Sequence, residues 1–257
     1  MSAAYSPDGK RIVTASGEQT AIIWDAASGA KLTTLQSHSD SVNSAAYSPD
    51  GKRIITASGD QTAIIWDAAS GAKLTTFDPS SWVLSAAYSP DGKRIVTASG
   101  DQTAIIWDAT SGAKLTTLQG HSGVVWSAAY NPDGQRIVTA SADQTAIIWD
   151  APSGAKLLTL QGHGGEVFSA AYSPDGQRIV TASADRTAII WDAANGTRLA
   201  TLRSHTGAVL SAAFSPERCE RLCTDTVRGA RMVYRYLHGG VWRKVLQLVL
   251  RPRYSAG

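Results

Sequence analysis

A stretch of twelve residues, Thr139 to Asp150, is written five times along the chain with almost no change. Each copy is close to T-A-S-A-D-Q-T-A-I-I-W-D and ends in a Trp-Asp pair. The pairs end at Asp25, Asp67, Asp108, Asp150 and Asp192, so successive copies are 42, 41, 42 and 42 residues apart. A fixed period of this size is typical of repeat architectures, in which each unit completes its core against the next one.

Each unit predicts four short β-strands separated by turns. The segments R-I-V-T-A-S and T-A-I-I-W are rich in β-branched and aromatic residues, and the short polar link between them predicts a hairpin. The segment S-A-A-Y precedes this hairpin and ends in S-P-D-G, where Pro in the second position and Gly in the fourth favour a type I turn. A fourth strand, K-L-T-T-L, follows A-x-S-G. We therefore predict an all-β chain with one four-stranded antiparallel sheet per unit.

These features resemble the tryptophan-aspartate (WD) repeat family of β-propellers. The resemblance covers residues 1 to about 214 and includes a Gly-His or Ser-His pair before the first strand, at His38, His121, His163 and His205. It also includes an Asp six residues before the Trp, at Asp60, Asp101, Asp143 and Asp185. The resemblance implies sheets arranged radially as the blades of a ring that serves mainly as an interaction platform.

The length of 257 residues has room for six such units. We predict a single β-propeller of six four-stranded antiparallel blades, with the sixth blade degenerate. The predicted units are 1–37, 38–78, 79–120, 121–162, 163–204 and 205–257.

Both ends of the chain leave alternatives open. The sixth unit begins regularly and changes character after Pro216. It is either a degenerate blade, with strands near Arg231–Tyr234 and Arg243–Leu250, or a tail translated in a shifted reading frame. At the other end, the first unit enters directly at its first strand and has no outer strand with which to seal the ring. Either the blades are self-contained, or the sequence is a piece of a longer repeat array.

The composition bears on location and partners. No hydrophobic stretch approaches the roughly 18 residues of a membrane span, and the N-terminus does not resemble a signal peptide. Two cysteines, Cys219 and Cys223, provide no disulfide framework. Residues 215–257 hold nine Lys/Arg and three Asp/Glu, while the preceding residues hold 15 and 18. We expect solvated charge on this basic tail, a cytoplasmic location and no membrane partner.

A His, a hydroxyl residue and an Asp recur together in units two, four and five. In unit five, His163, Asp185 and either Ser183 or Thr181 resemble the parts of a serine hydrolase. The repetition beside a Trp in three units argues against a single activated nucleophile. The WD resemblance implies instead a buried hydrogen-bonded chain from Asp to His to Ser/Thr to the indole N–H. The predicted network comprises His38, Asp60, Trp66, His121, Asp143, Trp149, His163, Asp185 and Trp191.

The spacing does not decide which hydroxyl takes part in this network, for example Thr139 or Ser141 in unit four. Unit one has no His and has Glu18 in place of the Asp, and unit three has no His. We expect those blades to be the least stable. We predict no catalytic residue, no metal site and no cofactor.

The differences between copies cluster around the Val that begins the first strand of each unit. Since the first strands of a propeller line its axis, these residues should surround one mouth of the central channel. In the WD family the same positions commonly contact bound partners, and exposed Trp, Phe and Leu are typical of interaction hot spots. The alternative is that they pack on one another and plug the channel. The predicted partner-binding residues are Asn43, Trp82, Leu84, Val124, Trp126, Glu166, Phe168 and Leu210.

The sequence thus predicts a non-enzymatic interaction scaffold that binds a protein or peptide. Lys and Arg residues recur beside both turns of the opposite face, but Asp residues accompany them and no aromatic residues interleave, so we expect no nucleic-acid partner. Self-association through unclasped blades one and six is a further option. The alternatives are a recently amplified or engineered array without a selected ligand, either by itself or as a fragment of a larger signalling protein, and an enzyme that uses the central funnel.

Overall fold

The described residues of the computed structural model are 2–215, 230–233 and 247–250. Twenty of their 22 strands form five four-stranded sheets, each with its strands in sequence order. All neighbouring strands in these sheets are antiparallel, as in the pairs β13–β14, β14–β15 and β15–β16. The described residues contain no helix, and hence none that is long and apolar enough to cross a membrane.

Each position in the sheet is occupied by corresponding segments of the five units. The first strands are β1 (Ala3–Tyr5), β5 (Val42–Tyr47), β9 (Val83–Tyr88), β13 (Val125–Tyr130) and β17 (Val167–Tyr172). The second strands are β2 (Arg11–Ala15), β6 (Arg53–Ser58), β10 (Arg94–Ser99), β14 (Arg136–Ser141) and β18 (Arg178–Ser183). The third strands are β3 (Thr20–Asp25), β7 (Ala63–Asp67), β11 (Thr103–Asp108), β15 (Thr145–Asp150) and β19 (Thr187–Asp192). The fourth strands are β4 (Lys31–Gln36), β8 (Lys73–Phe77), β12 (Lys114–Gln119), β16 (Lys156–Gln161) and β20 (Arg198–Arg203).

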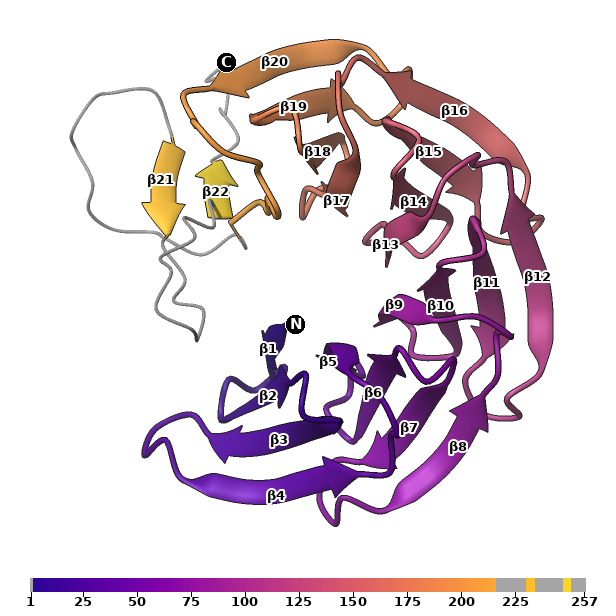
Figure 1. The fold of residues 1–257 in the computed structure, drawn as a ribbon, viewed down its shortest axis with the longest axis vertical. Helices are drawn as coiled ribbons and strands as arrows, with labels where there is room; N and C mark the ends of the chain where they lie inside the picture. The colour runs from indigo at the N-terminus through magenta and orange to yellow at the C-terminus, as the bar shows by residue number, and fades with distance from the viewer. Residues whose placement is uncertain (1, 216–229, 234–246, 251–257) are drawn as a thin grey trace.

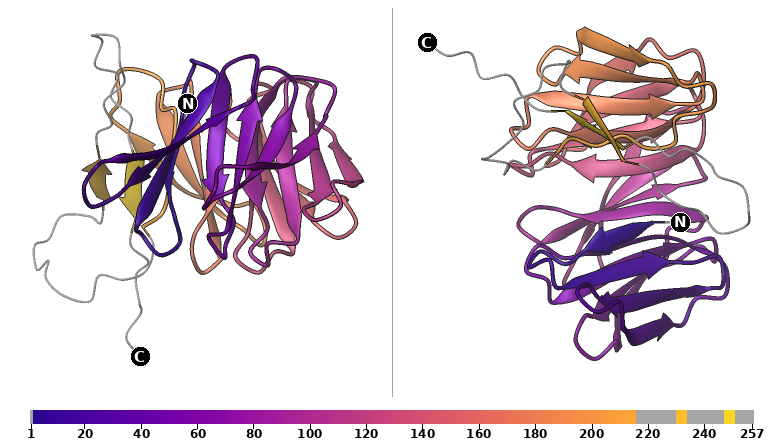
Figure 2. Two further views of the ribbon diagram at one scale, coloured as in Figure 1. Left: turned by 90° about the horizontal axis from the view of Figure 1, so that it is seen from below. Right: turned by 90° about the vertical axis from the view of Figure 1, so that its left-hand side faces the viewer.

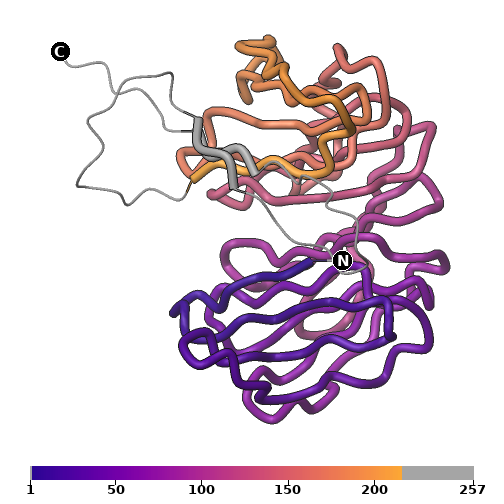
Figure 3. Tube along the Cα trace, turned by 60° about the vertical axis from the view of Figure 1, so that its left-hand side comes forward, coloured from indigo at the N-terminus to yellow at the C-terminus, as the bar shows by residue number. Residues whose placement is uncertain are grey.

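The five sheets stand around a central opening (Figure 1), with the first strand of each sheet innermost and the fourth outermost. The twist of each sheet turns its outer strands until they run around the circumference. Side views show the sheets stacked face to face along the arc (Figure 2). The first and fifth sheets are the two ends of this arc (Figure 3).

Each sheet has two edges where its strands reverse. We call the edge with the turns after the first and third strands the turn edge, and the edge with the other hairpin and the connections between sheets the loop edge. At the turn edge the S-P-D-G segments form the expected turns, and in the second sheet Gly51 N donates to Ser48 O over 2.9 Å. The φ angle of Gly51 is 71°, which favours a residue without a Cβ.

The core lies between sheets, because each sheet presents apolar side chains on both faces. Val96, Ile106 and Leu118 of the third sheet pack against Ile137 and Trp149 of the fourth. The same pairing recurs between the other neighbouring sheets. Burying one such Ile or Leu side chain stabilises the fold by roughly 1.5 to 3 kcal/mol. Every sheet therefore depends on its neighbours.

The outer face of the first sheet is less buried than the equivalent faces of the other sheets. Trp24 is half-buried, whereas Trp66 and Trp149 are 2% and 1% exposed. Tyr5 is 66% exposed, whereas the equivalent Tyr47 is half-buried. Among the described sheets, none packs on this face of the first one.

The described part of the sixth unit does not form a four-stranded sheet. Val209 and Ala212 are buried against the fifth sheet, but residues 209–215 are not a strand, since no described segment pairs with them as a ladder. Strands β21 (Ala230–Val233) and β22 (Gln247–Leu250) pair with each other, and they overlap the segments predicted as strands. The rest of the predicted sixth blade lies outside the described residues, so the structure shows five four-stranded sheets and six blades stay a prediction.

Candidate partner-binding site

Four of the predicted partner-binding residues occupy β-bulges. In β13, Val125 pairs with Ser141 and Ser127 with Ala140, which leaves Trp126 as the extra residue of the strand. The same register shift makes extra residues of Asn43, Leu84 and Phe168. A bulge redirects the side chain of its extra residue and often lies beside a functional site. Sequence alternation alone did not reveal these bulges.

Two of the bulged side chains reach toward the next sheet along the arc. Asn43 Nδ2 donates to Val83 O over 2.9 Å, which links the second and third sheets. Trp126 Nε1 donates to Glu166 Oε2 over 3.2 Å, and its ring lies edge-on to Phe168 with centroids 5.8 Å apart. The structure thus brings Trp126, Glu166 and Phe168 into one half-buried cluster. We call these three residues the rim cluster.

Trp82 adopts a different arrangement. Its carbonyl oxygen accepts from Gly100 N over 3.0 Å. Its indole lies on Gly100, where an added Cβ would come within 1.6 Å of Trp82 Nε1. The side chain is nevertheless 48% exposed. The remaining predicted residues, Leu84, Val124 and Leu210, are half-buried.

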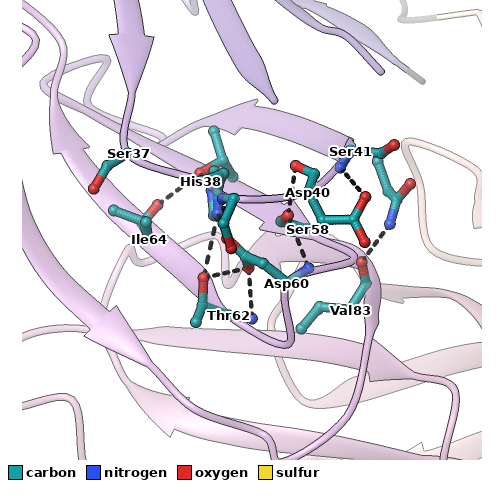
Figure 4. Close-up of polar contacts among 12 residues, drawn as sticks. Ser37, His38, Asp40, Ser41, Ser58, Asp60, Thr62, Ile64 and Val83 are labelled. Atoms are coloured by element: carbon teal, nitrogen blue, oxygen red, sulfur yellow. Dashed lines mark hydrogen bonds and ion pairs between the residues drawn. The ribbon is translucent and has the colours of Figure 1, made fainter. Parts of the chain in front are cut away.

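The structure also brings together the predicted hydrogen-bonded residues. In the second sheet, His38 Nδ1 lies 2.8 Å from Asp60 Oδ2 and Nε2 lies 2.7 Å from Thr56 Oγ1 (Figure 4). Trp66 Nε1 donates to the same Thr56 oxygen over 2.8 Å. The fourth and fifth sheets repeat this arrangement, each with a 2.7 Å contact from His Nε2 to Thr Oγ1. The loop before each of these sheets is thereby tied to the sheet itself.

The participating hydroxyl is the Thr, which settles the choice that spacing left open. Thr139 Oγ1 contacts both His121 Nε2 and Trp149 Nε1. Ser141 Oγ instead donates to Gly123 O over 3.0 Å and accepts from Asp143 N over 3.1 Å. The Ser therefore fastens the loop backbone, while the Thr joins the two rings.

The WD domain, G-beta repeat family model matches residues 1–25, 29–67, 71–108, 112–150 and 154–192, which together are more than half of the chain. The chain belongs to the WD-repeat family. Repeats of this family generally mediate protein–protein interaction and are typically non-enzymatic modules. No curated protein matches the chain in a sequence comparison. We refer to the five sheets below as WD-repeat blades.

Burial and hydrogen bonding set the charge state of the network. Burial lowers the pKa of His121 and His163, although the Asp beside each ring acts in the opposite direction. A neutral His donates from Nδ1–H to the Asp and accepts at Nε2 from the Thr hydroxyl, which leaves the Thr oxygen free to accept from the indole. Burial raises the pKa of Asp185, but hydrogen bonds from Thr187, Gly164 and His163 outweigh it and hold the pKa at about 2.

This geometry does not suit nucleophilic catalysis. Thr181 and Ser183 are both 0% exposed, so a substrate carbonyl cannot approach either hydroxyl. The Thr181 oxygen is also engaged by His163 and Trp191. Among the residues that the structure describes, no group of three His, Cys, Asp or Glu side chains could hold a metal ion.

Two WD-repeat blades have only part of the network. Trp24 donates to Thr14 over 2.8 Å in the first blade, and Trp107 donates to Thr97 over 2.9 Å in the third. In the third blade Pro79 is buried in the loop that carries the His elsewhere. The indole N–H is therefore satisfied in all five blades, and what the third blade lacks is the His that links the loop to this Thr.

Proposed function

We propose that this WD-repeat chain is a non-enzymatic interaction module that binds a protein or peptide partner around the central opening at its loop edge. The observation that supports it most is the coincidence of divergence and bulges. One of the two positions that differ most between otherwise near-identical repeats, occupied by Trp126 and Phe168 in the fourth and fifth blades, is the extra residue of its strand. A bulge that aims a variable side chain away from the ladder suits recognition better than packing.

The rim cluster has the chemistry of a hot spot. Trp and Phe offer large apolar surfaces, and the carboxylate of Glu166 offers a polar anchor beside them. Trp126 is already held by Glu166 and Phe168. The site would therefore lose little conformational freedom when a partner binds. Partial packing of these side chains on one another is thus compatible with binding. The contact surface we propose comprises Asn43, Trp82, Leu84, Val124, Trp126, Glu166, Phe168 and Leu210.

The test uses peptides selected from a random display library on the immobilised chain. Replacing Trp126 and Phe168 together by Ala should weaken the selected peptides by about 30-fold or more, the equivalent of roughly 2 kcal/mol. The matched control replaces Leu74 and Leu157, which are 50% and 44% exposed on the outermost strands. The proposal fails if the selected peptides bind the rim variant as tightly as the control variant.

We also propose that the ring contains six blades. Val209 and Ala212 occupy on the fifth blade the place that Val42 and Ala45 of the second blade occupy on the first. A sixth blade would cover the outer face of the first blade, where Trp24 is half-buried. Deleting residues 216–257 should then shift the fluorescence of Trp24 to longer wavelength. The Trp24 emission is obtained by subtracting the spectrum of the Trp24→Phe variant, with and without the deletion. An unchanged Trp24 spectrum would count against a sixth blade.

Our expectation of a cytoplasmic location stays a proposal.

A further inference from the structure

The third WD-repeat blade departs from both of its neighbours at two places on the loop edge and from the fourth blade at a third place. Its loop carries Pro79 in place of the network His. Trp82 stands where the second, fourth and fifth blades have Ser41, Val124 and Glu166. Gly100 stands where the fourth and fifth blades have an Ala. The second blade shares this Gly, as Gly59, and in the third blade Trp82 lies directly on Gly100.

The first consequence is a carboxylate oxygen without a partner. In the second blade, Asp60 Oδ2 accepts from Ser39 N and contacts His38, and Asp60 Oδ1 accepts from Thr62. In the third blade, Asp101 Oδ1 likewise accepts from Thr103 N and Oγ1 over 3.0 and 2.7 Å. Within the described part of the chain, Asp101 Oδ2 has no such partner, and the Asp101 side chain is exposed.

The second consequence is an exposed aromatic surface. The indole of Trp82 rests on the backbone of Gly100, the residue directly before Asp101. An Ala at this position would place its Cβ 1.6 Å from Trp82 Nε1, so the Gly is what allows the ring to lie there. One side of the ring is thereby supported, and the side chain keeps 48% of its surface exposed.

Acidic residues predominate among the sequence positions of the loop edge. Between residues 2 and 215 the loop edge carries eight carboxylates and two Lys/Arg, Arg186 and Arg203, both in the fifth blade. The turn edge carries ten Asp and thirteen Lys/Arg. Asp78 lies in the same connection as Trp82, and its Oδ1 accepts from Ser80 N over 2.9 Å. Lys side chains of the fourth strands reach this edge as well, since Lys73 Nζ donates to Ser37 Oγ over 3.5 Å, so carboxylates outnumber the cations there but are not its only charges.

We infer that Trp82 and Asp101 form a binding site for a cationic side chain, arginine before lysine, carried by a protein partner. An indole face attracts a cation, and a carboxylate beside it supplies the opposite charge. A planar guanidinium can stack on the ring and donate to the carboxylate at the same time, which an ammonium cannot do as well. This inference rests on the proposed function and assigns one partner residue to the third blade.

The direct test follows the indole N–H signals of the eight tryptophans in ¹H–¹⁵N spectra, with Trp82→Phe to identify Trp82. The probe is N-acetylargininamide, and its uncharged match is N-acetylcitrullinamide. We expect the arginine probe to move the Trp82 signal saturably with a dissociation constant in the millimolar range, and the citrulline probe to bind at least about tenfold more weakly, since it has no charge to offer the ring or the carboxylate.

Two pairs of variants separate the site from its surroundings. Asp101→Asn should weaken the arginine probe several-fold, while Asp40→Asn, an equal change of charge at an exposed loop-edge residue of the second blade, should not. Gly100→Ala retains Trp82 but displaces its ring, and should abolish the response. Gly59→Ala is the matched control, because its added Cβ would meet only the carboxylate end of Asp40, at 3.0 Å.

Several results would overturn the inference. An equal shift with citrulline would mean that charge is not recognised, and a shift of Trp126 instead of Trp82 would place the cation at the rim cluster. A single-stranded oligonucleotide that moved Trp82 more strongly than the arginine probe would assign the ring to base stacking. If the selected peptides depend on Trp126 and Phe168 but the arginine probe leaves Trp82 unmoved, the proposed function stands and the cation site is wrong.

Discussion

The third and fourth WD-repeat blades share their strands almost residue for residue and differ in what their loops do. In the fourth blade His121 contacts Asp143 and Thr139, so the loop is tied to the sheet through buried groups. In the third blade the His is absent, Asp101 keeps a free oxygen and Trp82 lies exposed beside it. The same fold thus uses equivalent positions for internal hydrogen bonding in one blade and presents them at the surface in the other.

This difference is tolerable because the third sheet keeps its indole N–H hydrogen-bonded without the His. Thr97 still accepts from Trp107 Nε1, so loss of the His leaves no indole N–H unpaired. Leaving a buried donor without an acceptor costs about 1 to 3 kcal/mol, and the third blade avoids that cost. What the third blade lacks is the His that links the loop to the Thr of the sheet, so this part of the loop is available for other contacts.

The largest effect should come from removing the shared hydroxyl. Thr139→Val leaves both Trp149 Nε1 and His121 Nε2 buried without a partner, so we expect a loss of roughly 2 to 4 kcal/mol in the free energy of unfolding. Thr97→Val leaves only Trp107 Nε1 without a partner and should lower the free energy of unfolding by about 1 to 2 kcal/mol. Urea unfolding of the two variants measures both values. Equal losses would show that His121 contributes nothing to the fourth blade.

An intermediate effect should appear on acidification. Burial holds the pKa of His121 and His163 below the ordinary 6.5, so the unfolded chain takes up protons first as the pH falls. Their contribution is complete above pH 6.5 and decreases as the pH falls through the folded pKa values. Asp185, whose pKa falls from 3.8 to about 2, adds a second loss between those values.

This acid sensitivity should belong to the blades that have the complete network. Hydrogen exchange of the indole N–H groups of Trp149 and Trp191 should accelerate relative to Trp107 as the pH falls from 6.5 through the folded pKa values of His121 and His163, because the unfolded chain takes up protons first. Trp107 serves as the internal control because its blade has no His. A constant ratio across this range would contradict the pKa assignment of His121 and His163.

The sequence predicted the sheets well and the site less well, for identifiable reasons. Strand order followed from β-branched segments separated by turns, and the family match supports the repeat. Thr139 and Ser141 are two residues apart and so lie on the same face of β14, which is why periodicity could not choose between them. The bulge at Trp126 depends on the register between two strands, and one strand's sequence does not determine it. The position of the Trp82 ring on Gly100 depends on a contact between two separate loops.

The smallest predicted effect tests whether the two blades differ only in their loops. The hairpin between the second and third strands places Gln102 and Gln144 at φ angles of 71° and 70°, a region that costs a side chain about 1 kcal/mol or more. Replacing either by Gly should stabilise the chain by about 0.5 kcal/mol, because the relief of strain exceeds the added entropy of the unfolded chain. Thermal unfolding of the two variants gives the comparison. Equal gains would mean that Trp82, resting on the neighbouring Gly100, leaves the hairpin of the third blade unstrained. A larger gain at Gln102 would mean that the Trp82 ring strains the hairpin on which it rests. The exposed position of the indole would then be coupled to strain in that turn.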